Sequence, residues 1–152
     1  MNRLRIYVDT SVFGGCFDKQ FAHESRQLFA EICQGRFRLI LSATTLRELE
    51  GAPDCVRRVA SNIPVGFVEY IALSMEVTAL RDAYLSAGVL GPASVRDAEH
   101  IAAATVAGAD LVVSWNFKHI VHFEKIDGFN AVNGRCGYQT LRIHSPKEVI
   151  KP

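Results

Sequence analysis

The strongest constraint on the fold is an alternation of short apolar runs with longer segments of helical spacing. The apolar runs, rich in Val, Ile and Leu, span residues 4–8, 38–42, 67–73, 110–114 and 141–143. Between them, segments such as 23–35, 74–88 and 94–109 repeat apolar residues three and four positions apart, which predicts helices. Strands that alternate with long helices are typical of βα units. The pattern predicts an α/β protein with a central, mainly parallel sheet of about four to five strands and helices on both faces.

The connecting segments are less regular. Residues 10–15 follow the first strand and contain two adjacent glycines, so they are interpreted as a turn. A short helix is predicted after residue 42 and another over 53–61. In the last third, residues 120–123 are interpreted as a short helical segment. The three glycines between residues 128 and 137 predict a loop.

Length and composition limit the class of protein. The chain has 152 residues, of which 49% are hydrophobic and 22% charged, enough for one domain over 1–152 with its own core. Its apolar runs fall far short of the roughly 20 residues that a membrane span needs, and its start lacks the pattern of a signal peptide. We therefore expect a soluble cytoplasmic protein that does not associate with membranes.

Charge and cysteine content add two expectations. The formal net charge is +1, so bulk charge gives no ground for nucleic-acid binding, which must rest on a specific site. The four cysteines are scattered and contain no CxxC pair. We expect reduced thiols, with Cys33 and Cys55 as buried structural residues.

Polar side chains follow the predicted strands at their carboxyl ends, where open parallel sheets bind ligands. These residues are Asp9, Ser11, Glu48, Asp97, Ser114 and Asn116. Carboxylates that meet there repel each other, by about 1 kcal/mol per pair at 4 Å in water and roughly 4 kcal/mol at an effective dielectric constant of 20. A divalent cation removes that cost, and oxygen ligands favour Mg²⁺ or Mn²⁺ over Zn²⁺. The chemistry that suits such a site is hydrolysis of a phosphodiester.

The acids also have structural interpretations. Asp9 could accept backbone N–H groups in the turn after a strand. Glu48 lies three residues after Thr45, and Asp97 lies three after Ser94, which is the spacing of a capping box. Spacing alone favours the capping role for both acids.

Residues beside the acids have two interpretations as well. Trp115 and Phe117 are predicted to lie in the core, with stacking on a nucleic-acid base as the alternative. His100 is predicted to be a structural histidine with satisfied hydrogen bonds. Lys118 and His119 either contact a substrate phosphate or belong to the solvated surface.

Three stretches together resemble the PIN-domain family, which includes the VapC-type toxin ribonucleases. They are IYVDTSVFGG (6–15), LSATTLRELEG (41–51) and SVRDAEHIAAATVAGADLVVSWNFKHI (94–120). Each motif is short, but their order and spacing are much more specific, and the resemblance covers nearly the whole chain. It implies a three-layer αβα PIN-like fold and an Mg²⁺- or Mn²⁺-dependent endoribonuclease, the toxin of a type II toxin–antitoxin pair. It also implies an RNA substrate, a small antitoxin partner and a homodimer.

The resemblance assigns roles to individual residues. The first acid of the family corresponds to Asp9, with Ser11 as its supporting residue. The second corresponds to Glu48, with Glu50 a weaker candidate, and the third corresponds to Asp97. By this resemblance Asp9, Asp97 and Glu48 would bind the metal.

The end of the fourth strand departs from the family pattern. A Ser or Thr there is usually followed by a fourth Asp, and the corresponding residues are Ser114 and Asn116. Asn116 is neutral and adds no charge to a metal site. This favours one rival to the nuclease, a PIN-fold interaction subunit with weak or no nuclease activity. A second rival is a phosphatase-type hydrolase with Asp9 as its nucleophile, although that class commonly has a second Asp where this chain has Ser11.

Overall fold

A five-stranded sheet forms the centre of the computed structural model, which describes residues 3–152. The strands lie in the order β3-β2-β1-β4-β5, and every neighbouring pair is parallel. Their bounds are β1 (Leu4–Val8), β2 (Phe37–Ser42), β3 (Val68–Ile71), β4 (Leu111–Val113) and β5 (Arg142–His144). All five predicted strands are confirmed, with differences of up to two residues at their ends.

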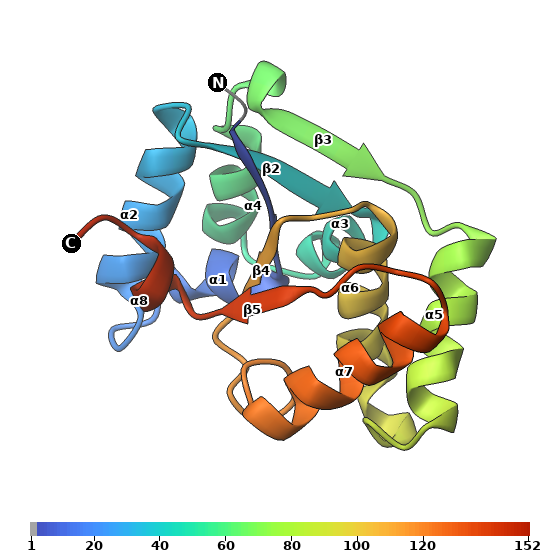
Figure 1. Ribbon diagram of the computed structural model, residues 1–152. Helices are drawn as coiled ribbons and strands as arrows, with labels where there is room; N and C mark the ends of the chain where they lie inside the picture. The colour runs from blue at the N-terminus through green and yellow to red at the C-terminus, as the bar shows by residue number, and fades with distance from the viewer. Residues whose placement is uncertain (1–2) are drawn as a thin grey trace.

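Helices cover both faces of this sheet, which makes the predicted three-layer arrangement (Figure 1). The α-helices are α1 (Thr10–Gly15), α2 (Ala22–Cys33), α3 (Ala43–Glu50), α4 (Asp54–Ser61), α5 (Met75–Ser86), α6 (Val95–Val106), α7 (Phe123–Arg135) and α8 (Pro146–Val149). Two 3₁₀ turns, η1 (Val65–Phe67) and η2 (Pro92–Ser94), precede β3 and α6. Helices α1, α2, α4 and α8 lie on one face, and α5, α6 and α7 lie on the other. No helix within residues 3–152 is long and apolar enough to cross a membrane.

Two apolar cores result from the alternation of side chains along each strand. In β1, Ile6 and Val8 face the core shared with α1, α2 and α4, while Tyr7 faces the core shared with α5, α6 and α7. Because the sheet is covered on both sides, its strands are apolar at successive positions and not at alternate ones. This explains why the strands were visible in the sequence as continuous apolar runs.

The segment after β1 is a helix, so the prediction of a turn over 10–15 is wrong. The helix α1 begins directly after Asp9 and includes both glycines. A Cβ at Gly15 would lie 2.6 Å from Ser25 Oγ and 2.9 Å from Trp115 Nε1. The glycine therefore allows close packing of α1 against its neighbours, and it does not mark a chain reversal.

The last third also differs from the prediction. Residues 128–135 belong to α7 and not to a loop, whereas residues 120–122 precede that helix. A Cβ at Gly128 would lie 2.9 Å from Val89 Cγ1, so this glycine too marks a close approach. On α7 the buried Asn133 accepts a hydrogen bond of 2.5 Å from the Tyr84 hydroxyl. Tertiary packing of this kind outweighs the low helix propensity of glycine.

The prediction of buried Cys33 and Cys55 is wrong. Both thiols are exposed, and Cys16 is the buried cysteine. Their neighbours Ile32 and Val56 take the core-facing positions on α2 and α4, so the next residue of each helix points away. All four cysteines are free.

Candidate functional site

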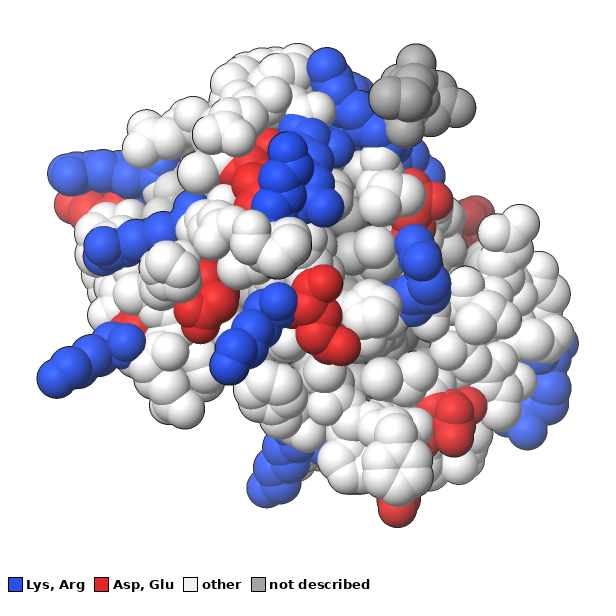
Figure 2. All heavy atoms as spheres, turned by 60° about the vertical axis from the view of Figure 1, so that its left-hand side comes forward, with Lys and Arg blue, Asp and Glu red and all other residues white. Residues whose placement is uncertain are grey.

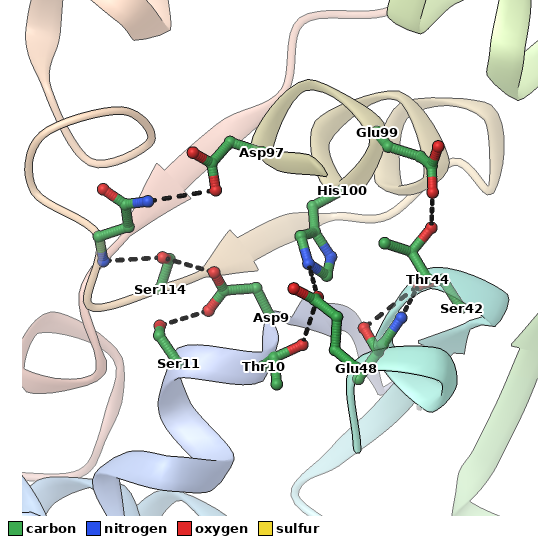
Figure 3. A network of polar contacts seen from close by, with 12 residues as sticks. Asp9, Thr10, Ser11, Ser42, Thr44, Glu48, Asp97, Glu99, His100 and Ser114 are labelled. Atoms are coloured by element: carbon green, nitrogen blue, oxygen red, sulfur yellow. Dashed lines mark hydrogen bonds and ion pairs between the residues drawn. The ribbon is translucent and has the colours of Figure 1, made fainter. Parts of the chain in front are cut away.

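The carboxyl ends of β1 and β4 bring Asp9 and Ser114 together (Figure 3). The ladder continues one step past both strands, because Asp9 N–H donates to the Val113 carbonyl at 3.2 Å and Ser114 N–H donates to the His144 carbonyl at 3.0 Å. Asp9 is only 4% exposed. Its carboxylate is thus placed by the sheet itself, at the edge predicted from the sequence.

Two serines hold the Asp9 carboxylate. Ser11 Oγ donates to Oδ1 at 2.6 Å, and Ser114 Oγ donates to Oδ2 at 3.0 Å. Each serine oxygen also accepts a backbone N–H, from Trp115 at 3.0 Å and from Asn116 at 2.9 Å respectively. The small polar residues predicted beside the first acid therefore join Asp9 to the segment that follows β4.

Burial dominates the ionisation of Asp9. Loss of solvent raises the pKa of this carboxyl, and the negative charge of Asp97 raises it further. The charge of His100 and the hydrogen bonds from Ser11 and Ser114 oppose the rise, but the pKa stays above its usual value. The ionised form of Asp9 is therefore held at a cost that a positive charge would relieve.

Asp97 lies in the first turn of α6 and faces the segment after β4. Asn116 Nδ2 lies 3.2 Å from Asp97 Oδ1, and His119 Nδ1 lies 3.0 Å from Oδ2. Asn116 Oδ1 accepts His119 N–H at 2.9 Å, which fixes the direction of the amide. Ser94 makes no side-chain cap bond, so the capping role of Asp97 is wrong.

Glu48 projects from α3 toward the same edge. The cap of this helix is Ser42, which accepts Thr45 N–H at 3.1 Å, so the capping box of Thr45 and Glu48 is also wrong. Glu48 Oε1 instead accepts Thr10 Oγ1 at 2.8 Å and lies 2.5 Å from His100 Nε2. Both contacts use Oε1, and no side chain described in residues 3–152 bonds Oε2. Glu50 is exposed.

His100 lies between Glu48 and the core and is 2% exposed. Its Nδ1 lies 2.6 Å from the Tyr7 hydroxyl, so both ring nitrogens are bonded, as predicted for a structural histidine. Burial alone would lower the pKa of His100, but the Tyr7 oxygen, Glu48 and Asp9 together raise it well above its usual value. For Glu48 the signs are opposite: burial raises the pKa of this carboxyl. The hydrogen bond and charge of His100 outweigh burial, so the pKa of Glu48 is lowered.

Tyr7 was not among the predicted site residues, and Thr10, which follows Asp9 directly, was given no role. A signal for Tyr7 existed: it carries the one hydroxyl within the first apolar run, and a buried hydroxyl needs a partner. His100 lies three residues after Asp97 on the same helix face, and its link to Glu48 was not foreseen.

The donors suit a hard divalent cation. Within residues 3–152, no group of three or more His, Cys, Asp or Glu side chains is arranged to hold a metal ion. Asp9 and Asp97 are two carboxylates linked through hydrogen bonds: Ser114 bonds Asp9, and Asn116 bonds both Ser114 and Asp97. Mg²⁺ takes one or two direct carboxylates and keeps several waters. The pair therefore fits Mg²⁺ or the chemically similar Mn²⁺.

The surroundings of the acids partly differ from the prediction. Trp115 is buried and stacks on Phe21, with ring centroids 4.3 Å apart, as expected for a core residue. Phe117 is 50% exposed, so its core assignment is wrong. Lys118 is also exposed, while His119 is half-buried against Asp97. Figure 2 shows Lys and Arg mixed with Asp and Glu over the face drawn, in keeping with the small net charge.

Comparisons with known proteins bear on the fold. No family model and no curated protein sequence matches the chain. Among solved structures, it is similar to a chain of VapBC2 from Rickettsia felis bound to a DNA fragment from the promoter. That match has a TM-score of 0.57 and 15% identity, and covers 93% of this chain and 98% of the other. It is also similar to a chain of DNA-bound VapBC from Salmonella typhimurium, with a TM-score of 0.54 and 18% identity, covering 94% and 98%. These similarities and the parallel αβα sheet establish a PIN-like fold.

Proposed function

We propose that this chain is a divalent-metal-dependent endoribonuclease, the toxin component of a type II toxin–antitoxin pair. The observation that carries the proposal is the pairing of the buried Asp9 carboxylate with Asp97 at the carboxyl edge of the sheet, with Glu48 beside them (Figure 3). An ionised carboxylate that is as buried as Asp9 costs stability, and its retention beside a second acid fits a site built for a cation.

The proposed mechanism divides the work among these residues. Asp9 and Asp97 would hold Mg²⁺ or Mn²⁺, which when bound supplies Lewis acidity for phosphodiester hydrolysis. Ser11 and Ser114 keep the Asp9 oxygens in place through the hydrogen bonds of 2.6 and 3.0 Å. Glu48 would direct Oε2 toward the attacking water and accept a proton from that water as it attacks the phosphorus.

The segment after Asn116 would meet the substrate. His119 uses Nδ1 for Asp97, so a phosphate would contact Nε2, which donates to it when the ring carries a proton on both nitrogens. Lys118 is exposed next to it and adds a mobile positive charge. These local groups supply the attraction for RNA that a net charge of +1 does not provide.

The partners follow from the same proposal. The two structural neighbours are VapBC complexes, which supports a small antitoxin as partner. An apolar groove of about 450 Å³ lies between α3, which carries Glu48, and α4; its lining includes Leu46, Leu49 and Ala60. Such a groove suits the apolar face of a short partner helix. We also propose a homodimer that acts in the cytoplasm.

The direct test is cleavage of single-stranded RNA by the purified protein. We expect cleavage with millimolar Mg²⁺ or Mn²⁺, none in EDTA, and none of DNA of the same sequence under the same conditions. Circular dichroism checks that EDTA leaves the protein folded. Intact RNA at every metal concentration, with folded protein, would contradict the proposal.

The Asn116→Asp variant tests whether a negative charge at the fourth acid position strengthens metal binding. In Asn116→Asp a carboxylate replaces the amide that now lies 3.2 Å from Asp97 Oδ1. We expect a lower melting temperature in EDTA because two carboxylates then repel. The Mn²⁺ concentration for half-maximal cleavage should fall about tenfold, equivalent to about 1.4 kcal/mol of binding.

The control for this variant is Asn62→Asp, which adds the same charge at an exposed position on α4's C-terminal end. It should leave the half-maximal Mn²⁺ concentration unchanged and lower the melting temperature only slightly, because an acid at a helix C-terminus costs about 0.3–1 kcal/mol. If Asn116→Asp also leaves the half-maximal Mn²⁺ concentration unchanged, position 116 has no part in metal binding.

One observation favours the interaction subunit as a second candidate. The amide of Asn116 already occupies one oxygen of Asp97, and His119 occupies the other. A site satisfied in this way is stable without a cation. The phosphatase alternative gains less support, because that class commonly pairs its first Asp with another two residues later, where this chain has Ser11.

A further inference from the structure

A buried chain of hydrogen bonds starts at Glu48 and leads away from Asp9 and Asp97 into the core. It begins at Glu48 Oε1, passes through the His100 ring with contacts of 2.5 Å at Nε2 and 2.6 Å at Nδ1, and reaches the Tyr7 hydroxyl. Figure 3 shows His100 pointing from α6 toward Glu48. The chain thus joins the acid on α3 to the central strand β1.

The chain returns to the helix that carries Glu48. The Tyr7 hydroxyl also lies 2.6 Å from Ser42 Oγ and 3.4 Å from Thr45 Oγ1. Ser42 is the cap of α3 and accepts Thr45 N–H. Tyr7 and His100 therefore hold both the start of α3 and the side chain near its end.

The direction of the contact with Glu48 does not depend on the charge of His100. An ionised carboxylate can only accept, so the hydrogen lies on Nε2. If the ring is neutral, the Tyr7 hydroxyl donates to Nδ1. If the ring is charged, Nδ1–H donates to Tyr7, whose hydroxyl then donates to Ser42. Both arrangements satisfy every group and present the same N–H to Oε1.

The position of the Tyr7 hydroxyl argues for a role beyond packing. Tyr7 is fully buried, and its ring belongs to the core shared with α5, α6 and α7. A phenylalanine would fill nearly the same volume, but it would leave Ser42 Oγ and His100 Nδ1 without this partner. An unpaired buried polar group destabilises the folded protein. A buried polar network is costly unless every member is bonded, and its benefit is a single defined geometry.

We propose that Tyr7 and His100 are positioning residues that hold Glu48 through Oε1 and leave Oε2 directed at the attacking water. This rests on the proposed nuclease function. Outer partners of catalytic groups typically contribute about 10- to 100-fold to metal affinity or activity. The effect should appear in kcat and not in KM, because Glu48 acts on the water and not on RNA binding.

The matched pair of variants is Tyr7→Phe and Tyr84→Phe. Tyr84 is also fully buried, and its hydroxyl bonds Asn133 and Thr105, away from Glu48. Each variant loses one buried hydroxyl. We expect Tyr7→Phe to lower kcat about tenfold with KM within about twofold, and Tyr84→Phe to leave kcat unchanged. His100→Gln, which keeps an N–H donor, should retain more activity than His100→Leu.

A measurement without RNA or metal separates this proposal from the nuclease function. In the folded protein with EDTA, the ¹⁵N-labelled His100 ring should give a slowly exchanging Nε2–H resonance. Tyr7→Phe and Glu48→Gln should shift that resonance or speed its exchange, and Tyr84→Phe should not. An unchanged resonance in Tyr7→Phe, or an equal loss of kcat in both tyrosine variants, would overturn the positioning role. Absence of RNA cleavage by the unmodified protein would contradict the nuclease function alone.

Discussion

Asp9→Asn is expected to lower the rate of metal-dependent RNA cleavage about 1,000-fold while the protein stays folded. A bound cation stabilises transition-state charge by several kcal/mol, and each 1.36 kcal/mol is a factor of ten in rate. Asn has the same shape as Asp, and its oxygen and amide can still bond Ser11 and Ser114. Asp97→Asn should have an effect of the same size, measured as the initial rate on single-stranded RNA.

Stability provides a second readout for Asp9→Asn. Because burial raises the pKa of Asp9, the folded state favours the protonated acid, and the ionised form destabilises the protein above the usual pKa. The neutral amide removes that cost, so the melting temperature in EDTA at pH 7 should rise. Mn²⁺ at 100 times its dissociation constant should stabilise the unmodified protein by about 2.7 kcal/mol, and the variant far less.

Glu50→Gln is the control for both acids, since Glu50 is an exposed acid two residues after Glu48 on the same helix. It should cleave RNA at the unmodified rate. Full activity in purified Asp9→Asn and Asp97→Asn would show that the cleavage comes from elsewhere and would refute this site.

Glu99→Gln is expected to lower the free energy of unfolding by about 2 kcal/mol at pH 7. Glu99 is buried on α6, accepts Thr44 Oγ1 at 2.5 Å and pairs with Arg81 of α5 at 2.8 Å. Breaking a fully buried pair costs roughly 3–5 kcal/mol. The smaller value here reflects the Arg81 side chain, which is 22% exposed and keeps its contact with Asp82. The melting temperature should fall by roughly 4–8 °C.

The pH dependence identifies the source of this stability. Burial raises the pKa of Glu99, but hydrogen bonds from Thr44 and Arg81 outweigh it and lower the pKa below 4.5. A lowered folded-state pKa means that the contribution is complete above the unfolded value and is lost as the pH falls through the folded value. The difference between the two proteins should therefore shrink below pH 4.5.

Asp82→Asn is the matched control, because Asp82 pairs with the same arginine but is 62% exposed. Exposed pairs contribute about 0–1 kcal/mol, so its melting temperature should change little. Equal losses in the two variants, or a Glu99→Gln difference that stays constant from pH 3 to 7, would contradict the buried pair as the cause.

The framework of the fold was predictable from local patterns. The central strands are largely apolar on both faces and follow or precede a helical repeat, so strands such as residues 4–8 and 38–42 could be located without contacts. The errors lie where glycine has a tertiary role. Gly15 and Gly128 lie inside helices at positions where a Cβ would come within 3 Å of a neighbouring group. The sequence contains no local signal for such a neighbour.

The position of the acids in the fold could be predicted from the sequence, but their hydrogen-bond partners could not. The alternation of strands and helices by itself determined that Asp9, Glu48, Asp97 and Ser114 lie at the carboxyl edge of one parallel sheet. The spacing that favoured capping roles for Glu48 and Asp97 was misleading, because caps depend on backbone angles that spacing does not report. Only the tertiary structure decided that Asn116 lies against Asp97 and that Tyr7 reaches Glu48 through His100. These pairs are 19 and 41 or more residues apart in the chain, and their contacts depend on the packing of α6 and α3 against β1, which no local pattern encodes.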